Sequence, residues 1–203
     1  MLNLSKVSFA YPDCVVLRDF SAQLAPGVSL VLGGDGRGKT TLQCLLAGEL
    51  PPDGGRLLLD GVFLDEQPEA YRQQVFWIDP RSKAHDALTV AEYLQSVQRA
   101  YPGFDGAVLA EVMDGLSLSP HLQKNLFTLS TGSKRKVWLA AAAASGAKLT
   151  LLDGPFASLD QASINFVLQL LTEAAQQSSR IWVVADYVPP SVGPLTTLIN
   201  LGD

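Results

Sequence analysis

Eight residues near the start of the chain have the types and spacing needed to bind a phosphate group. Residues 33 to 40 read Gly-Gly-Asp-Gly-Arg-Gly-Lys-Thr, which fits the phosphate-loop pattern G-x-x-x-x-G-K-[ST]. The four glycines, Gly33, Gly34, Gly36 and Gly38, allow positive φ, so we expect successive N–H groups to line a concave nest for an anion. Lys39 would add a point charge for the β- and γ-phosphates, and the Thr40 hydroxyl would ligate Mg²⁺. A nucleotide phosphate is therefore the expected ligand.

The segments on either side of this loop predict the strand and the helix that such a loop requires. The apolar stretch Val28-Ser-Leu-Val-Leu precedes it, and leucines 42, 45, 46 and 50 follow it at helical spacing. A helix that begins at the loop directs its unpaired N–H groups and its dipole at the phosphates. This context argues against the alternative, a glycine-rich turn with a chance lysine.

Beyond the loop, the hydrophobic pattern alternates strands with helices. Apolar residues interrupt polar ones over residues 2–9 and 15–24, which predicts an N-terminal β layer of short strands. Further strands are predicted at 56–59, 75–78, 149–152, 180–185 and 195–201, with a helix over 163–176. Residues 88–144 have a mostly helical period. Such alternation implies a parallel sheet with crossover connections. We expect one α/β domain over 1–203, with a helical subdomain over 84–145.

Composition excludes some classes of function. The chain has 203 residues and a net charge of −5, and no basic cluster is longer than Lys134-Arg135-Lys136, which argues against a nucleic-acid surface. No apolar run approaches the roughly 20 residues of a membrane span, and the N-terminus does not resemble a signal peptide. We expect a soluble, cytoplasmic chain. Cys14 and Cys44 lack metal-site spacing and are expected to be free thiols, buried as small hydrophobic residues.

A second candidate ligand for Mg²⁺ follows a later strand. Residues 149–153 read Leu-Thr-Leu-Leu-Asp, a buried strand that delivers a carboxylate at its end. Carboxylate oxygens are hard ligands suited to the Mg²⁺ of a nucleotide. Many ordinary strands also end in aspartate, so Asp153 is a candidate metal ligand only in combination with the motifs around it.

Those motifs follow one another in an order that identifies a family. Residues 129–133 read Leu-Ser-Thr-Gly-Ser, and residues 157–160 read Ala-Ser-Leu-Asp. With these motifs the chain resembles the ATP-binding cassette family of phosphate-loop NTPases over nearly its whole length. The loop through Thr41 resembles the Walker A motif of that family, residues 129–133 its LSGGQ signature, residues 149–153 its Walker B motif and residues 157–160 its D-loop.

The resemblance implies ATP and Mg²⁺ as cofactors and a pair of cassettes as the working unit. In the family, the signature of one cassette contacts ATP held by the other, so Ser130, Thr131, Gly132 and Ser133 would act in trans at a helix N-terminus. Without the other motifs, an ordinary helix N-cap at Ser130 with a solvated basic face would be the simpler interpretation. The implied nucleotide contacts are Tyr11 (stacking on adenine), Gly33, Gly34, Asp35, Gly36, Arg37, Gly38, Lys39, Thr40, Thr41, Ser130 and Gly132, and the implied metal ligands are Thr40 and Asp153.

Three positions depart from the family pattern, and all three concern hydrolysis and coupling. Gly154 stands where the family has the glutamate that polarises the attacking water, and Asp186 stands where a switch histidine is expected. Residues 79–81 read Asp-Pro-Arg where a glutamine is expected. Loss of a general base typically slows a reaction by about 10² to 10⁴. We therefore predict that binding is kept and hydrolysis weakened, with Lys39, Asp153 and Asp160 as the remaining candidates for catalytic roles.

The resemblance implies an ATP-binding subunit that dimerises with a second cassette, at the inner face of a membrane, and drives separate transmembrane subunits. A regulatory or assembly module that binds nucleotide and hydrolyses little is the alternative, favoured by Gly154 and Asp186. A phosphate-loop kinase is disfavoured because the signature and D-loop would then have no role.

Overall fold

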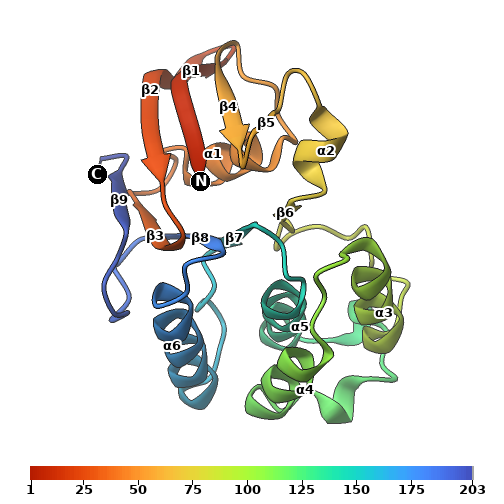
Figure 1. Ribbon diagram of the computed structural model, residues 1–203. Coiled ribbons are helices and arrows are strands. Elements are labelled where there is room, and N and C mark those ends of the chain that lie inside the picture. The colour runs from red at the N-terminus through yellow and green to blue at the C-terminus, as the bar shows by residue number, and fades with distance from the viewer. Residues whose placement is uncertain (203) are drawn as a thin grey trace.

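Two sheets form the framework of the computed structural model, which describes residues 1–202 (Figure 1). The antiparallel sheet has the strand order β2-β1-β4-β5, and the parallel sheet has the order β6-β7-β8-β3-β9. The strands of the first sheet are β1 (Leu2–Tyr11), β2 (Cys14–Leu24), β4 (Gly54–Leu59) and β5 (Val62–Phe63). Those of the second are β3 (Gly27–Leu32), β6 (Val75–Phe76), β7 (Leu149–Asp153), β8 (Ile181–Asp186) and β9 (Thr197–Asn200).

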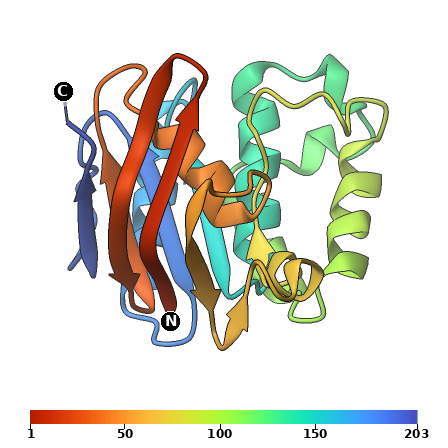
Figure 2. The ribbon, with the colours of Figure 1, turned by 90° about the horizontal axis from the view of Figure 1, so that it is seen from above.

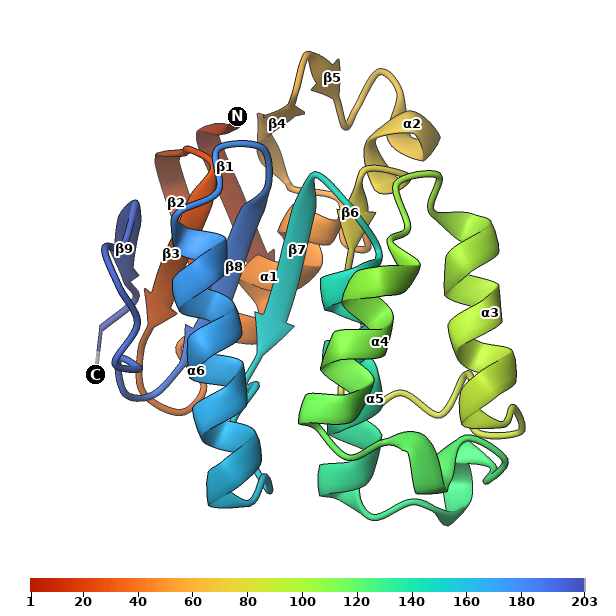
Figure 3. The ribbon, with the colours of Figure 1, turned by 60° about the horizontal axis from the view of Figure 1, so that its bottom comes forward.

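Helices separate and cover the two sheets. The α-helices are α1 (Lys39–Ala47), α2 (Pro68–Arg72), α3 (Val90–Ala100), α4 (Gly106–Gly115), α5 (Thr131–Ala144) and α6 (Gln161–Ala175), and the 3₁₀ turns are η1 (Ser119–His121) and η2 (Leu126–Thr128). Helix α1 lies between the antiparallel sheet and one face of the parallel sheet, where Leu42, Leu45 and Leu46 are fully buried. Helix α6 covers the opposite face of the parallel sheet, beside α5 (Figure 3).

The helices α3, α4 and α5 pack together to one side of both sheets (Figures 2 and 3). Helix α3 begins with a capping box, in which the Thr89 side chain accepts from the Glu92 N–H and the Glu92 carboxylate accepts from the Thr89 N–H. All of these helices fall inside residues 84–145. Whether that range behaves as a separate subdomain remains a prediction.

The expected α/β class is confirmed, and several boundaries move. Residues 14–24 form one long strand with irregular pairing to β1 instead of several short strands. Helix α1 begins at Lys39, directly after the loop as expected, but it ends at Ala47, three residues before Leu50, where Gly48 takes φ 72°. Strand β6 ends at Phe76, two residues before the predicted end. The local pattern therefore located most elements, but it missed the short β5 and α2 and misplaced several ends by one or more residues.

Two expectations drawn from composition can be compared with the structure. None of the helices formed by residues 1–202 is long and apolar enough to cross a membrane. Both cysteines are free thiols, as expected, but Cys14 is exposed and Cys44 only partly buried, so the prediction that both are buried is wrong. Cys14 lies at the turn between β1 and β2, where its neighbours do not cover it.

Candidate nucleotide-binding site

The phosphate loop follows the carboxyl end of β3 and leads directly into α1. Positive φ occurs at Gly36 (70°) and Gly38 (90°) within the loop, whereas we expected it at all four glycines. A Cβ on Gly38 would lie 2.3 Å from Cγ1 of Val16, so this position has neither the space nor the backbone conformation for a side chain. The Gly34 N–H donates to the carbonyl of Gly202 (3.0 Å) and is not free for an anion. The second half of the loop therefore forms the cradle.

Lys39 is held against the loop that precedes it. Its Nζ donates to the carbonyls of Gly33 (2.7 Å) and Gly34 (2.8 Å), and the residue is 8% exposed. A buried ammonium with fixed carbonyl partners provides a positive charge at the base of the loop.

Thr40 and Asp153 meet although they are far apart in the sequence. The Thr40 hydroxyl donates to Oδ2 of Asp153 over 2.6 Å. They meet because β7, β8 and β3 are parallel neighbours, so that Asp153 at the end of β7 and the loop after β3 share one edge of the sheet. A hydroxyl and a carboxylate are hard oxygen donors, and this donor set fits Mg²⁺.

A cavity of about 450 Å³ opens in front of these groups. Its size is suited to a nucleotide-sized ligand. The predicted residues that line it are Tyr11, Gly36, Arg37, Gly38, Lys39, Thr40, Thr41 and Asp153. The Tyr11 hydroxyl lies 3.4 Å from Oγ1 of Thr41 at the edge of the cavity, in a position compatible with contact to a base. The lining residues that the sequence did not single out as contacts are Cys14, Val16, Cys44, Arg81 and Tyr187.

The signature residues lie outside this cavity, at the start of α5. The Ser130 side chain accepts from the Ser133 N–H (3.1 Å) and caps the helix. A Cβ on Gly132 would lie 2.2 Å from the Ser158 carbonyl oxygen, so the D-loop packs directly on the signature. The N-cap interpretation is therefore correct as far as local structure goes, and a role in trans is compatible with it.

The basic residues after the signature do not form a solvated face. Lys134 forms an ion pair with Asp86, and Lys136 forms one with Asp160 (2.7 Å), and the two lysine side chains are 16% and 17% exposed. Arg135 donates to the Ala157 carbonyl, and burial lowers its pKa. The D-loop is thus tied to α5 by side chains as well as by contact.

Asp160 has a structural role that the sequence did not indicate. Its carboxylate accepts from the Ser163 N–H (2.9 Å) at the start of α6 and from Lys136. The ion pair with Lys136 and the bonds from Ser163 hold the pKa of Asp160 well below its usual range. Asp160 does not line the cavity, so its position within this chain does not support the catalytic role for which it was a candidate.

The two replaced hydrolysis positions lie at the strand ends next to Asp153. Gly154 has φ 53°, and no atom beyond its chain neighbours lies within 4 Å of where its Cβ would be. Asp186 ends β8 and is half-buried, and burial raises the pKa of its carboxyl group, an effect partly opposed by the N–H of Tyr187. The Oδ1 of Asp186 accepts that N–H over 2.7 Å. Gly154 has no carboxylate, and the carboxylate of Asp186 is half-buried and bonded to the Tyr187 N–H.

Tyr187 is the main residue that sequence reasoning missed. Its ring lies over Nζ of Lys39, 3.8 Å from the ring centroid, and its hydroxyl donates to Oδ1 of Asp35 over 2.6 Å. A signal was available, because Tyr187 directly follows the strand that neighbours β3 in a parallel sheet.

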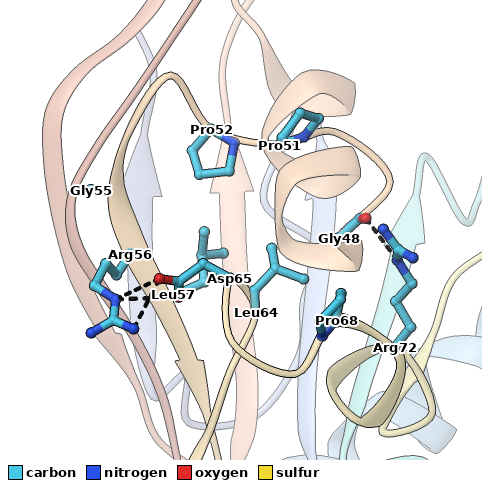
Figure 4. Close-up of a pocket in the computed structure, with 10 residues that line it drawn as sticks. All are labelled: Gly48, Pro51, Pro52, Gly55, Arg56, Leu57, Leu64, Asp65, Pro68 and Arg72. Atoms are coloured by element: carbon cyan, nitrogen blue, oxygen red, sulfur yellow. Dashed lines mark hydrogen bonds and ion pairs between the residues drawn. The ribbon is translucent and has the colours of Figure 1, made fainter.

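A second cavity, of about 400 Å³, lies away from the phosphate loop, between the end of α1, β4 and α2 (Figure 4). Its walls are mostly apolar, and its main polar contacts are the ion pair of Arg56 with Asp65 and the bond from Arg72 to the Gly48 carbonyl (2.9 Å). It contains none of the predicted site residues.

Comparison with known proteins agrees with this geometry. The family model described as "ABC transporter" matches residues 17–157. The taurine import ATP-binding protein TauB of Pseudomonas entomophila is 32% identical over 99% of this chain and 79% of its own length. A solved ATP-binding subunit of an ABC transporter superposes with a TM-score of 0.82 at 25% identity, covering 93% of this chain and 80% of that one. The dimeric cassette MJ0796, bound to ADP and Pi, shares the fold with a TM-score of 0.76 at 20% identity, covering 93% and 88%.

A domain of this fold, with a phosphate loop, a Walker B carboxylate and a signature helix, is an ATP-binding cassette. The chain belongs to the ABC transporter family.

Proposed function

We propose that this chain binds Mg-ATP, pairs with a second cassette and drives separate transmembrane subunits at the inner face of a membrane, with weak hydrolysis at its own site. The observation that carries the proposal is the bond of 2.6 Å between Thr40 and Asp153 in front of the buried Lys39, next to a Gly154 that has no carboxylate. The groups that would hold a metal-bound triphosphate lie close together, and glycine at position 154 lacks the carboxylate of the expected general base.

The residues divide the work as follows. The N–H groups in the second half of the loop and the start of α1 would hold the phosphates, and Lys39 would neutralise part of their charge. Thr40 and Asp153 would hold Mg²⁺, which supplies charge neutralisation of the phosphate oxygens when bound. Tyr11 would contact the base. Ser130 and Gly132 would contact nucleotide held by the partner cassette, which accounts for a signature that lies outside this chain's own cavity.

Binding is tested by calorimetry with Mg-ATP on the wild type and on Lys39→Ala. Loss of the lysine should weaken binding at least tenfold, because a charge-assisted bond to phosphate is lost. Lys148→Ala is the matched control, since Lys148 is a half-exposed lysine whose nearest acid is Asp60 at 3.6 Å. If the wild type gives no heat, or if Lys39→Ala binds equally well, the proposal fails.

Pairing is tested by sedimentation with and without Mg-ATP. We expect a dimer in the presence of nucleotide and its weakening in Ser130→Gly, because glycine retains most of the N-cap stability and removes the hydroxyl. Nucleotide binding by the monomer should be unchanged in this variant.

The second candidate function is a nucleotide-gated regulatory or assembly module with little or no hydrolysis. Gly154 and the half-buried Asp186 favour it. The two functions differ in the partner, so co-expression with a membrane protein of several apolar spans, followed by purification of a complex whose activity needs Lys39, would favour transport.

A further inference from the structure

The phosphate-binding lysine is covered by an aromatic ring. The ammonium of Lys39 can donate three hydrogen bonds, and it already donates two, to the carbonyls of Gly33 and Gly34. The ring of Tyr187 lies over the remaining side, 3.8 Å from Nζ to its centroid. A phosphate oxygen that approaches Lys39 from the cavity therefore meets Tyr187 first.

Tyr187 is fixed at both ends. Its N–H donates to Asp186 (2.7 Å) at the end of β8, and its hydroxyl donates to Asp35 (2.6 Å) within the phosphate loop. The bond to Asp35 also raises the pKa of the Tyr187 hydroxyl. The side chain thus spans the mouth of the loop from strand to loop, with the ring between.

We propose that Tyr187 is a latch over the phosphate loop, which competes with the β- and γ-phosphates of nucleotide for Lys39 and must be displaced when they bind. The proposal rests on the nucleotide binding proposed above. Tyr187 is 59% exposed and is followed by residues without helix or strand until β9, so its ring can leave without breaking the core.

The contacts of the latch are weak enough for phosphate to displace them. A cation–π contact changes an equilibrium by roughly twofold to fivefold at an exposed site and by more when the cation is buried; here the ring is exposed and the ammonium is buried. The exposed hydrogen bond to Asp35 adds an effect of roughly similar size. Several charge-assisted bonds between a triphosphate and the loop exceed both. The latch therefore lowers the affinity for nucleotide without abolishing binding.

The first test needs no nucleotide. Surface lysines are acylated with a small amine-reactive ester, and the modification of Lys39 relative to Lys148 is followed by peptide mass spectrometry. We expect Tyr187→Ala to raise the relative rate at Lys39 about threefold or more, and Tyr187→Phe to raise it less, because the ring remains. An unchanged rate in Tyr187→Ala would overturn the latch.

The second test is calorimetry with Mg-ATP on the same variants. Tyr187→Ala should bind about threefold to twentyfold more tightly than the wild type, and Tyr187→Phe and Asp35→Asn should bind more tightly by smaller factors. Equal or weaker binding by Tyr187→Ala would overturn the latch, and weaker binding would make Tyr187 a nucleotide contact. If the wild type and all variants fail to bind, the proposed function fails as well. Asp35→Asn keeps the proposal testable if the alanine variant does not fold.

Discussion

Restoring a carboxylate at position 154 tests whether the site lacks only its general base. Gly154 directly follows Asp153 at the carboxyl end of β7, and no heavy atom beyond its chain neighbours lies within 4 Å of a Cβ built there. A glutamate in Gly154→Glu therefore has room. Because positioned general bases typically contribute about 10² to 10⁴ in rate, we expect turnover of Mg-ATP to rise at least tenfold.

The backbone conformation at position 154 also predicts how much this substitution destabilises the protein. Gly154 has φ 53°, in the left-handed region, where a residue with a Cβ is less stable by about 1–2 kcal/mol. The free energy of unfolding of Gly154→Glu should fall by about that amount. Urea unfolding measures it, and Gly154→Ala separates the backbone cost from any effect of the carboxylate.

The rate comparison needs a control of the same size. Gly154→Gln has the length of glutamate and the same backbone cost but no base. Phosphate release should rise in Gly154→Glu and stay near the wild-type rate in Gly154→Gln. If the wild type already hydrolyses ATP at an ordinary cassette rate, or if the glutamate and glutamine variants behave alike, the reasoning about a missing base is refuted.

Two further predictions concern the contacts that hold the framework of the site. Arg180 donates to the carbonyls of Ala142 (3.0 Å) and Ala143 (2.8 Å), and burial lowers its pKa to about 10. Since lysine lacks the planar fork that serves both carbonyls, Arg180→Lys should lower the free energy of unfolding by about 2–3 kcal/mol, and a loss below about 1 kcal/mol in urea unfolding would contradict this. The pKa of Asp160 is held low in the folded protein by Lys136, so its stabilisation is present above the unfolded pKa of about 3.9 and is lost as the pH falls below it. Asp160→Asn should therefore lower the melting temperature at pH 7 and flatten its decline between about pH 5 and 2, and an equally steep acid decline in both proteins would exclude the ion pair as a cause.

The predictable part of the site comes from groups whose positions follow from local pattern and strand order. Lys39 and Thr40 lie at the start of a helix that follows a strand. The spacing of the glycines and of the leucines predicts this context. Asp153 meets Thr40 because both follow parallel strands at the same sheet edge. The class of fold and the two principal metal-ligand candidates were therefore within reach of the sequence.

The remaining contacts depend on segments that approach from elsewhere in the fold. The Gly34 N–H donates to the carbonyl of Gly202, which lies after the last strand, and no local sequence pattern indicates that bond. Lys134 and Lys136 looked like a solvated face because their acidic partners, Asp86 and Asp160, come from distant loops. Exposure and pairing of long charged side chains are tertiary properties, so the sequence alone could not show that these lysines are paired.

The residues proposed to bind nucleotide and the positions expected to support hydrolysis lie in different parts of the fold. The groups proposed to hold phosphate and metal belong to the loop, to the first turn of α1 and to the last residue of β7, and α1 itself packs into the core through Leu42, Leu45 and Leu46. The two positions where hydrolytic groups were expected, Gly154 and Asp186, lie just after β7 and at the end of β8, and neither lines the cavity. Replacement of the expected groups at these positions leaves the fold and the cradle intact. On the proposed function, the chain would therefore bind ATP without its general base, and the energy of binding would be available to close it on a partner cassette.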